Sequence, residues 1–252
     1  MSLVDLPTET LVQVFASLDS LTDAVNLSKT CTRFDHLLND TWNMATIFEA
    51  IADNIVLPET PDAAWLETHF GPDCLWRPRR SKIARTISHA KTLEFLTTIG
   101  FPDHCIGLRG IDLQHFRKNV EQDKRVWPQR LHGPDGYTKG IYYPEAYYVL
   151  GCVGGHEVIA ACKTGRISVQ GIGWRRPEAT SMISFLVILG TGVSSRDAIV
   201  EFIERTDDPF KLGLCVWFLE TVYSKMKMYD KLLDKASRSW WDLLFDIADY
   251  PE

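Results

Sequence analysis

The first 51 residues carry apolar side chains at intervals of three and four, a spacing that predicts short amphipathic helices. The first helix places Leu11, Val14, Phe15 and Leu18 on one stripe, and Pro7 stands where the first turn of a helix tolerates proline. Three further helices are expected from the same spacing. Their apolar positions are Leu21, Ala24, Val25 and Leu27, then Phe34, Leu37 and Leu38, then Trp42, Ile47, Phe48 and Ile51.

Helices of this length are marginal on their own in water, and a few of them enclose too small a core for independent stability. We therefore expect the N-terminal helices to need a partner surface. That surface is either another protein or, as the alternative, the rest of the same chain.

The segment that follows the fourth helix is interrupted by residues that break helices. These residues are Pro58, Pro61, Gly71, Pro72 and Pro78. Although residues 63–70 have room for two turns of helix, we interpret residues 51–79 as a linker. The expected division is a helical domain at 1–50 and a second domain at 80–252.

Residues 80–252 change from a helical to a strand-like period and back. The apolar spacing predicts a helix over residues 83–98, and Gly100 with Pro102 supplies the signal that ends it. Residues 146–153, 156–162 and 166–170 are then rich in aromatic and β-branched side chains. Two pairs of turn residues separate these runs, Gly154-Gly155 and Thr164-Gly165. An antiparallel β-meander flanked by helices follows, with helix resuming from Pro177 onward, so the expected fold class is α+β.

Composition and charge exclude several classes of function. The 252 residues carry a formal net charge of -6, which gives no broad positive field for nucleic acid or for acidic lipid. Residues 182–189 form the longest apolar run, shorter than the roughly 20 residues of a membrane span. The N-terminus lacks the basic and apolar regions of a secretory signal, and the six cysteines form no C-x-x-C pair. We expect a cytoplasmic or nuclear protein with reduced thiols.

The sequence contains no set of residues with the spacing of a known catalytic or metal site. Cys152, His156 and Cys162 flank the first predicted hairpin, but their spacing matches no common zinc site, and the cysteines fit the core of a sheet. Neither a nucleophile elbow nor a phosphate-binding loop in the required strand and helix context occurs. We expect no enzyme activity, no cofactor and no metal.

The order of signals in residues 3–48 resembles an F-box, the module that docks a substrate receptor onto the Skp-type adaptor of a cullin ubiquitin ligase. The residues that carry the resemblance are Leu6-Pro7, Glu9, Leu11, Val14-Phe15, Leu18-Asp19, Ala24 to Leu27, Thr30-Cys31, Arg33-Phe34, Leu37 and Trp42. The resemblance implies a set of apolar anchors for the adaptor, namely Leu6, Pro7, Leu11, Val14, Leu18 and Val25. We expect Phe15 and Phe34 to pack the helices of this segment against one another.

Four stretches of the second domain are similar to the SUKH superfamily of immunity proteins and their eukaryotic relatives. They read LEFLTTIGFPD, YYVLGCVGGHEVIAACKTGRISV, SMISFLVILG and SRSWWDLLFDI, in the order of the family. A long insertion at residues 108–144 departs from that pattern. The resemblance implies a binding module.

Together these resemblances imply a substrate receptor that binds the adaptor, and through it a cullin ligase, with its first domain and an unidentified target protein with its second. The target surface is expected at the rim of the meander and in the insertion, at Trp127, Tyr137, His156 and Arg166. An adaptor-bound scaffold outside a ligase, or an immunity-like inhibitor, is the first alternative. An enzyme in the second domain is the other.

Overall fold

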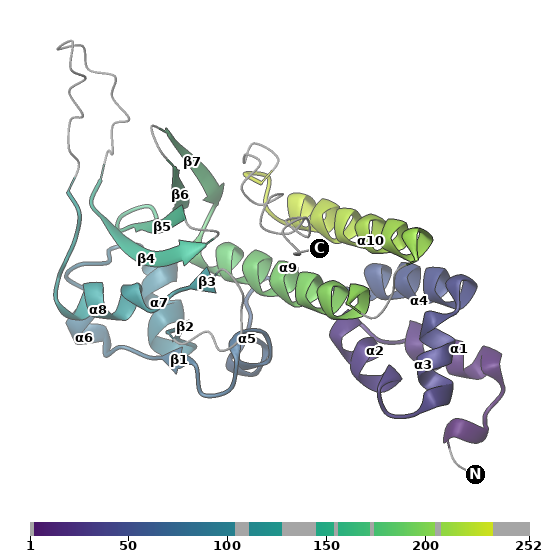
Figure 1. Ribbon diagram of the computed structural model, residues 1–252. Coiled ribbons are helices and arrows are strands. Elements are labelled where there is room, and N and C mark those ends of the chain that lie inside the picture. Colours follow the sequence, from purple (N-terminus) through teal and green to yellow (C-terminus); the bar gives the residue numbers. More distant parts are fainter. Residues whose placement is uncertain are drawn as a thin grey trace. The chain divides into compact units, whose positions relative to one another are not determined.

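The computed structural model describes residues 3–103, 111–127, 145–153, 156–171, 174–204 and 208–233. The chain forms two compact units, each built from segments that are distant in the sequence (Figure 1). The first comprises Met1–Leu57, Thr191–Met228 and Leu244–Glu252, and the second comprises Pro58–Gly190 and Tyr229–Leu243. This division differs from the expected boundaries, because one helix, α9 (Met182–Ile203), contributes to both units.

The four helices predicted in the N-terminal segment are all present, after a short turn of 3-10 helix, η1 (Leu3–Asp5). They are α1 (Thr8–Ala16), α2 (Leu21–Ser28), α3 (Thr32–Asn39) and α4 (Thr41–Asn54). Side-chain caps fix two of the starts, since Ser20 accepts from the amide of Asp23 and Asp40 accepts from that of Asn43. Phe15 and Phe34 meet edge to face at 5.9 Å between centroids, which confirms that they hold the helices together.

The core of the first unit is completed by α9 and α10 (Pro209–Tyr229). The Phe48 side chain of α4 is fully buried and contacts the rings of Phe202 on α9 and Phe218 on α10. The ammonium of Lys225 donates to the carbonyls of Asp53 and Ile55 at the end of α4, at 2.7 and 3.2 Å. Part of the partner surface that the N-terminal helices need therefore comes from the same chain.

The second unit contains a five-stranded antiparallel sheet in the order β3-β4-β5-β6-β7. Its strands are β3 (Ile111–Asp112), β4 (Tyr147–Val153), β5 (His156–Ala161), β6 (Ile167–Gly171) and β7 (Trp174–Ala179). The meander predicted over three strands is confirmed as β4 to β6. The prediction of helix from Pro177 onward is wrong for residues 177–179, which end β7. Pro177 lies opposite Ser168 on this edge strand, where a missing amide is tolerated.

A glycine allows β3 to approach β4 closely. Gly151 has a φ of 158°, and a Cβ atom there would lie 1.8 Å from the carbonyl oxygen of Asp112. The register between β4 and β5 shifts at the same place, between Val149 and Gly151. Only glycine fits this position without a displacement of the backbone.

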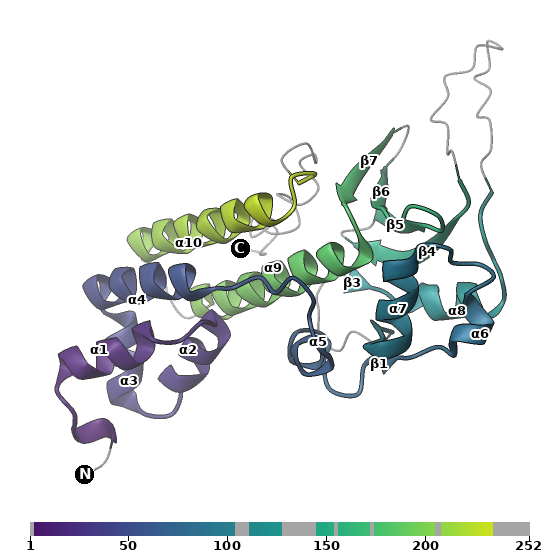
Figure 2. The ribbon, with the colours of Figure 1, turned by 180° about the vertical axis from the view of Figure 1, so that it is seen from behind.

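Helices and a short two-stranded sheet make up the rest of the second unit. They are α5 (Ala63–Phe70), β1 (Leu75–Trp76) paired with β2 (Phe101–Pro102), α6 (Arg80–Ile83), α7 (Ala90–Thr98) and α8 (His115–Glu121). Both views place α7 and α8 on the same side of β4 (Figure 2). Phe116 of α8 packs edge to face on Tyr148 of β4, with 6.1 Å between centroids.

The segment expected to be a linker is folded between residues 63 and 76. Asp62 caps α5 by accepting from the amide of Trp65, and Leu66 and Phe70 are fully buried. Pro61 precedes this helix and Pro72 follows it, so they mark its ends and do not interrupt it. Gly190 of α9 lies against α5, because a Cβ atom there would be 2.9 Å from the Trp65 ring and 3.1 Å from the Cβ of His69.

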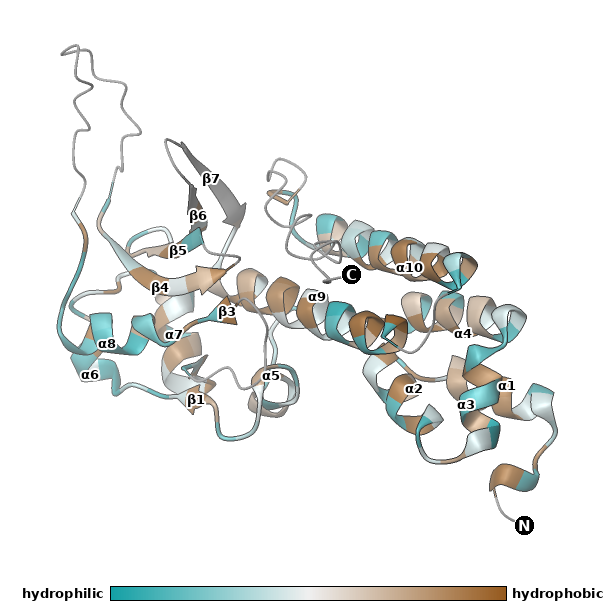
Figure 3. Ribbon diagram, viewed as in Figure 1, coloured by the Kyte–Doolittle hydropathy of each residue, from teal (hydrophilic) through white to brown (hydrophobic). Residues whose placement is uncertain are grey.

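Helix α9 extends well beyond the apolar run recognised in the sequence. With 22 residues, it is long and apolar enough to cross a membrane by length and composition alone. However, 72% of its most apolar 18-residue stretch is buried within the structure, which is typical of a core helix. Its hydropathy is high over most of its length and falls in one hydrophilic stretch (Figure 3).

Candidate functional site

The residues expected to bind the adaptor divide into exposed and buried positions. Leu6, Val14 and Leu18 are half-buried and Pro7 is exposed, so these four offer apolar surface. Leu11 and Val25, expected among the anchors, are each only 1% exposed and lie in the core of the first unit. The apolar side chains at the centre of an amphipathic helix face are buried in the core, and only those at the edges of that face reach the surface. This explains why some of the expected anchors are exposed and others are buried.

Two side chains hold the segments on either side of α1, which carry the anchors Leu6, Pro7 and Leu18. The Arg33 guanidinium of α3 donates to the carbonyl of Val4, just before Leu6 and Pro7. The Asn54 side chain at the end of α4 donates to the carbonyls of Ala16 and Leu18 at 2.9 and 3.0 Å. The surface that presents these apolar side chains is therefore held by polar contacts from two other helices.

Trp42 is an exposed aromatic residue that the sequence assigned to the apolar pattern of the fourth helix. Its side chain is 85% exposed, although Phe48 on the same helix is fully buried. These positions are six residues apart, which turns them about 120° from one another around a helix. The angular position of a residue around α4 therefore distinguishes the exposed Trp42 from the buried Phe48.

In the second unit, Trp127 is the exposed aromatic residue among the expected target-binding positions, at 60% exposure. The Arg125 guanidinium lies 5.2 Å from the centre of its ring and donates to both carboxylate oxygens of Asp123, at 2.6 and 2.8 Å. Asp123 also accepts from the Tyr148 hydroxyl at 3.0 Å. Hydrogen bonding to Arg125 lowers the pKa of Asp123, so this carboxylate stays ionised and holds the guanidinium beside the ring.

The register of the sheet brings two of the expected target-binding residues to the same end and separates a third. Val126 bridges to Tyr147, Tyr147 pairs with Ala161, and the amide of Ala161 donates to the carbonyl of Arg166. Trp127 and the exposed Arg166 are therefore at one end of the sheet. His156 is exposed at the other end of β5, and Tyr137 lies outside the described residues.

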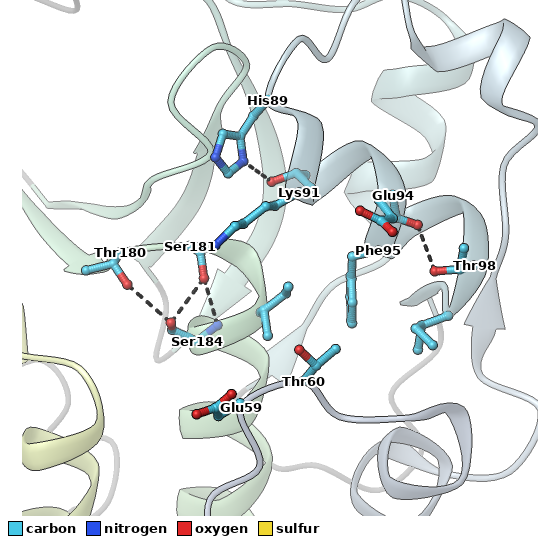
Figure 4. A pocket seen from close by; sticks show the side chains of 13 residues that line it. Glu59, Thr60, His89, Lys91, Glu94, Phe95, Thr98, Thr180, Ser181 and Ser184 are labelled. Atoms are coloured by element: carbon cyan, nitrogen blue, oxygen red, sulfur yellow. Dashed lines mark hydrogen bonds between the residues drawn. The ribbon is translucent and has the colours of Figure 1, made fainter.

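A pocket of about 680 Å³ lies beside α7 and the start of α9, and nothing in the sequence analysis singled it out (Figure 4). Its size is within the usual range of ligand sites. Six of its thirteen lining residues carry hydroxyls, three are apolar and four are titratable. They are Glu59, Thr60, His89, Lys91, Thr92, Glu94, Phe95, Thr98, Ile99, Thr180, Ser181, Ile183 and Ser184.

Hydrogen bonds within the protein occupy most of the hydroxyls of the pocket. His89 Nδ1 lies 2.8 Å from the Thr92 hydroxyl, and Ser184 lies within 3.2 Å of the hydroxyls of both Thr180 and Ser181. The amide of Ser184 donates to the hydroxyl of Ser181, which caps the start of α9. This wall is therefore a preformed, internally bonded surface.

The buried Asp230 stands behind the pocket and supplies negative charge at the start of α9. Its carboxylate accepts from the amide and the hydroxyl of Thr180, at 2.7 and 2.8 Å, and from the amide of Leu232 at 3.0 Å. Burial raises the pKa of the neighbouring Tyr229 to about 12, with further contributions from Asp230 and Glu59. The negative charges of Asp230 and Glu59 therefore disfavour the binding of an anion in this part of the pocket.

Three of the described cysteines, Cys74, Cys162 and Cys215, are buried thiols, whereas Cys31 and Cys152 are half-buried. Burial raises the pKa of Cys162 to about 11 and that of Cys215 to about 12, so both are protonated at neutral pH and are poor nucleophiles. Within the described ranges, no group of three or more His, Cys, Asp or Glu side chains is arranged to hold a metal ion.

Comparison with known families gives two matches. Residues 3–49 match the family described as F-box-like, and residues 61–242 match the family described as SUKH-4 immunity protein. A search of curated proteins and a search of solved structures gave no match.

Proposed function

The chain belongs to the SUKH-4 immunity protein family and carries an F-box-like domain at residues 3–49, and from this premise we propose that it is a substrate-receptor subunit of a cullin ubiquitin ligase. The F-box-like domain binds the Skp-type adaptor, and the SUKH-4 domain binds the target protein. The protein acts in the cytoplasm or nucleus, where the ligase and its targets meet.

The mechanism is one of proximity. A receptor of this kind supplies no reacting group, and it raises the effective concentration of a target lysine beside a charged ubiquitin-conjugating enzyme. Both family assignments are typical of non-catalytic domains, which supports a mechanism based on binding.

The observation that carries the proposal is the F-box-like match itself, combined with apolar side chains at the surface of the matched segment. Leu6, Pro7, Val14 and Leu18 are at least partly exposed, and Trp42 is 85% exposed. Apolar and aromatic side chains of this kind form the centres of protein interfaces. They therefore support a docking surface on α1 and the segment before it.

The SUKH-4 assignment also supports a second candidate function. An immunity protein is an inhibitor that binds its target and needs no ligase, so the chain would then be an adaptor-bound inhibitor. This candidate shares the adaptor surface with the first. Ubiquitylation of a captured protein separates the two.

Co-expression of the full chain with the Skp-type adaptor, followed by size-exclusion chromatography, tests the first step of the proposal. We expect the two proteins to elute together as one complex. Reconstitution with cullin and ubiquitin-activating and ubiquitin-conjugating enzymes then tests the second step, because a receptor supports cullin-dependent ubiquitylation and an inhibitor does not. Separate elution of chain and adaptor would overturn both candidates.

A further inference from the structure

The pocket beside α7 has an apolar floor between two carboxylates. Phe95 is 3% exposed and contributes to the floor with the half-buried Ile99 and Ile183. Glu94 belongs to α7, whereas Glu59 belongs to the segment before α5, and the close view shows them on opposite sides of this floor (Figure 4). A ligand that spans the floor therefore has a carboxylate available on either side.

The charged side chains of the pocket have no partner within the described part of the chain. The carboxylates of Glu59 and Glu94 and the ammonium of Lys91 make no hydrogen bond or ion pair there, and all three residues are exposed. Figure 4 shows the Lys91 side chain directed toward Ser181. The two carboxylates are thus free to accept hydrogen bonds from a ligand.

The start of α9 beside the pocket is not available to an anion. A helix N-terminus usually attracts negative charge, but here the buried carboxylate of Asp230 already accepts from the amide and hydroxyl of Thr180. A phosphate or carboxylate bound next to Thr180 would face Asp230 at close range. Two free carboxylates and this buried one outweigh the single cation of Lys91.

We propose that this pocket binds a long basic side chain, that of arginine or lysine, in an extended segment of a partner protein. The methylene stem lies on Phe95, Ile99 and Ile183, and the cation at its end donates to Glu59 or to Glu94, according to the direction in which the segment crosses the floor. Arginine suits the site best, because its guanidinium is weakly hydrated and has donors in several directions. The pocket is larger than one side chain and also accommodates the neighbouring residues of the segment. The identification of that partner as the ligase target rests on the function proposed above.

The test is titration of the full chain, labelled with ¹⁵N, with the blocked tripeptide acetyl-Ala-Arg-Ala-amide, followed by NMR. We expect shifts at the amides of Lys91, Glu94 and Ser184, and an affinity about tenfold higher than for the peptide with Gln at the centre. The lysine peptide is expected to bind less tightly than the arginine peptide and more tightly than the glutamine one. Increasing salt is expected to weaken binding, because the contact is between charges at a surface.

Variants identify the residues responsible. The double substitution Glu59→Gln with Glu94→Gln keeps the side-chain shape and is expected to reduce affinity for the arginine peptide by about tenfold. Glu157→Gln is the matched control, since Glu157 is exposed on β5 and does not line the pocket. Lys91→Gln removes a like charge and is expected to increase affinity about threefold.

Three outcomes would overturn the proposal. They are equal affinity for the arginine and glutamine peptides, unchanged affinity in the double variant, and a preference for a glutamate peptide that Lys91→Gln abolishes. Binding is measured without adaptor or ligase, so failure of the chain to bind the adaptor would leave this result intact. Conversely, an empty pocket would not affect adaptor binding.

Discussion

The rings of Phe48 and Phe218 lie 5.4 Å apart, centroid to centroid, although one belongs to the F-box-like match and the other to the SUKH-4 match. Both side chains are fully buried. The two family matches therefore do not correspond to the two compact units, because helices from the SUKH-4 segment complete the core of the F-box-like domain. An F-box-like domain removed from this chain would expose the ring of Phe48 to water.

The first prediction concerns a fragment that contains residues 1–57 alone. Without α9 and α10, the buried side chains of α4 meet solvent, so we expect low helicity and rapid proteolysis. Joining residues 191–228 to this fragment through a Gly-Ser linker is expected to restore helicity in the absence of adaptor. Circular dichroism and limited proteolysis measure both effects. Equal helicity in the two proteins would show that α9 and α10 are dispensable.

The second prediction concerns the adaptor surface. Apolar anchors at the centre of an interface contribute about 1 to 3 kcal/mol each, so replacing Leu6, Val14 and Leu18 together with Ala is expected to reduce adaptor affinity at least about a hundredfold. Val56→Ala is the control, since Val56 is 79% exposed and lies outside the F-box-like match. Surface plasmon resonance with immobilised adaptor gives the affinities. Wild-type affinity in the triple variant would place the docking surface elsewhere.

Leu11→Ala should behave differently from those three substitutions. Leu11 is 1% exposed, so its truncation leaves a cavity that is expected to lower the free energy of unfolding by about 2 to 5 kcal/mol. Adaptor binding by the folded fraction should change little. Urea denaturation, followed by fluorescence, measures the loss.

The third prediction compares two glycines in helices. A Cβ atom at Gly190 would lie 2.9 Å from the Trp65 ring, so Gly190→Ala forces α5 and α9 apart and is expected to cost about 1 to 3 kcal/mol. At Gly213 of α10, nothing lies within 4 Å of the added atom. Gly213→Ala is therefore expected to stabilise the protein by about 0.5 to 1 kcal/mol, through helix propensity. Thermal unfolding checks that the two substitutions shift the melting temperature in opposite directions.

The fourth prediction concerns pH. Hydrogen bonding to Arg125 lowers the pKa of Asp123 below the usual value of about 3.9, so ionised Asp123 stabilises the fold above that value. The stabilisation is lost as pH falls through the lowered pKa. Wild type should therefore melt above Asp123→Asn at pH 7, and the two melting temperatures should converge in strong acid. Asparagine tolerates the positive φ of 48° at this position, so the substitution adds no backbone strain.

Scanning calorimetry across the acid range measures this convergence. The exposed Asp19 is the matched control, because its carboxylate makes no hydrogen bond or ion pair with the described residues, and Asp19→Asn should leave the melting temperature at pH 7 unchanged. A constant difference between wild type and Asp123→Asn, down to the lowest pH, would show that the ion pair does not contribute.

The short N-terminal helices and the central meander were predictable from the sequence, because both depend on local periodicity. The stripe of Leu11 and Phe15 indicates a helix, but periodicity alone does not reveal which margin of the stripe stays at the surface. Residues 63–70 have room for two turns of helix and form α5, but the surrounding prolines favoured a linker, whereas Pro61 only precedes the helix. Pro177 favoured the start of a helix, whereas it lies on the edge strand β7.

The pocket was beyond the reach of sequence analysis, because its walls come from three separate segments. Glu59, Glu94 and Ser184 belong to no motif and become neighbours only through the packing of the second unit. The same limit applies to the first unit, since nothing near Phe48 in the sequence indicates Phe202 or Phe218 as its partners. Both the pocket and the core around Phe48 depend on contacts between residues that are far apart in the sequence.

The division of the first unit between the two ends of the chain has a consequence during protein synthesis. Residues 1–57 leave the ribosome before α9 and α10, and α10 is complete only after residue 228 has been translated. At about 5 to 20 residues per second, the interval is on the order of ten to thirty seconds. Throughout this interval the nascent F-box-like helices lack the full set of their core partners, so the side chains that α10 later covers, Phe48 among them, remain exposed to other proteins.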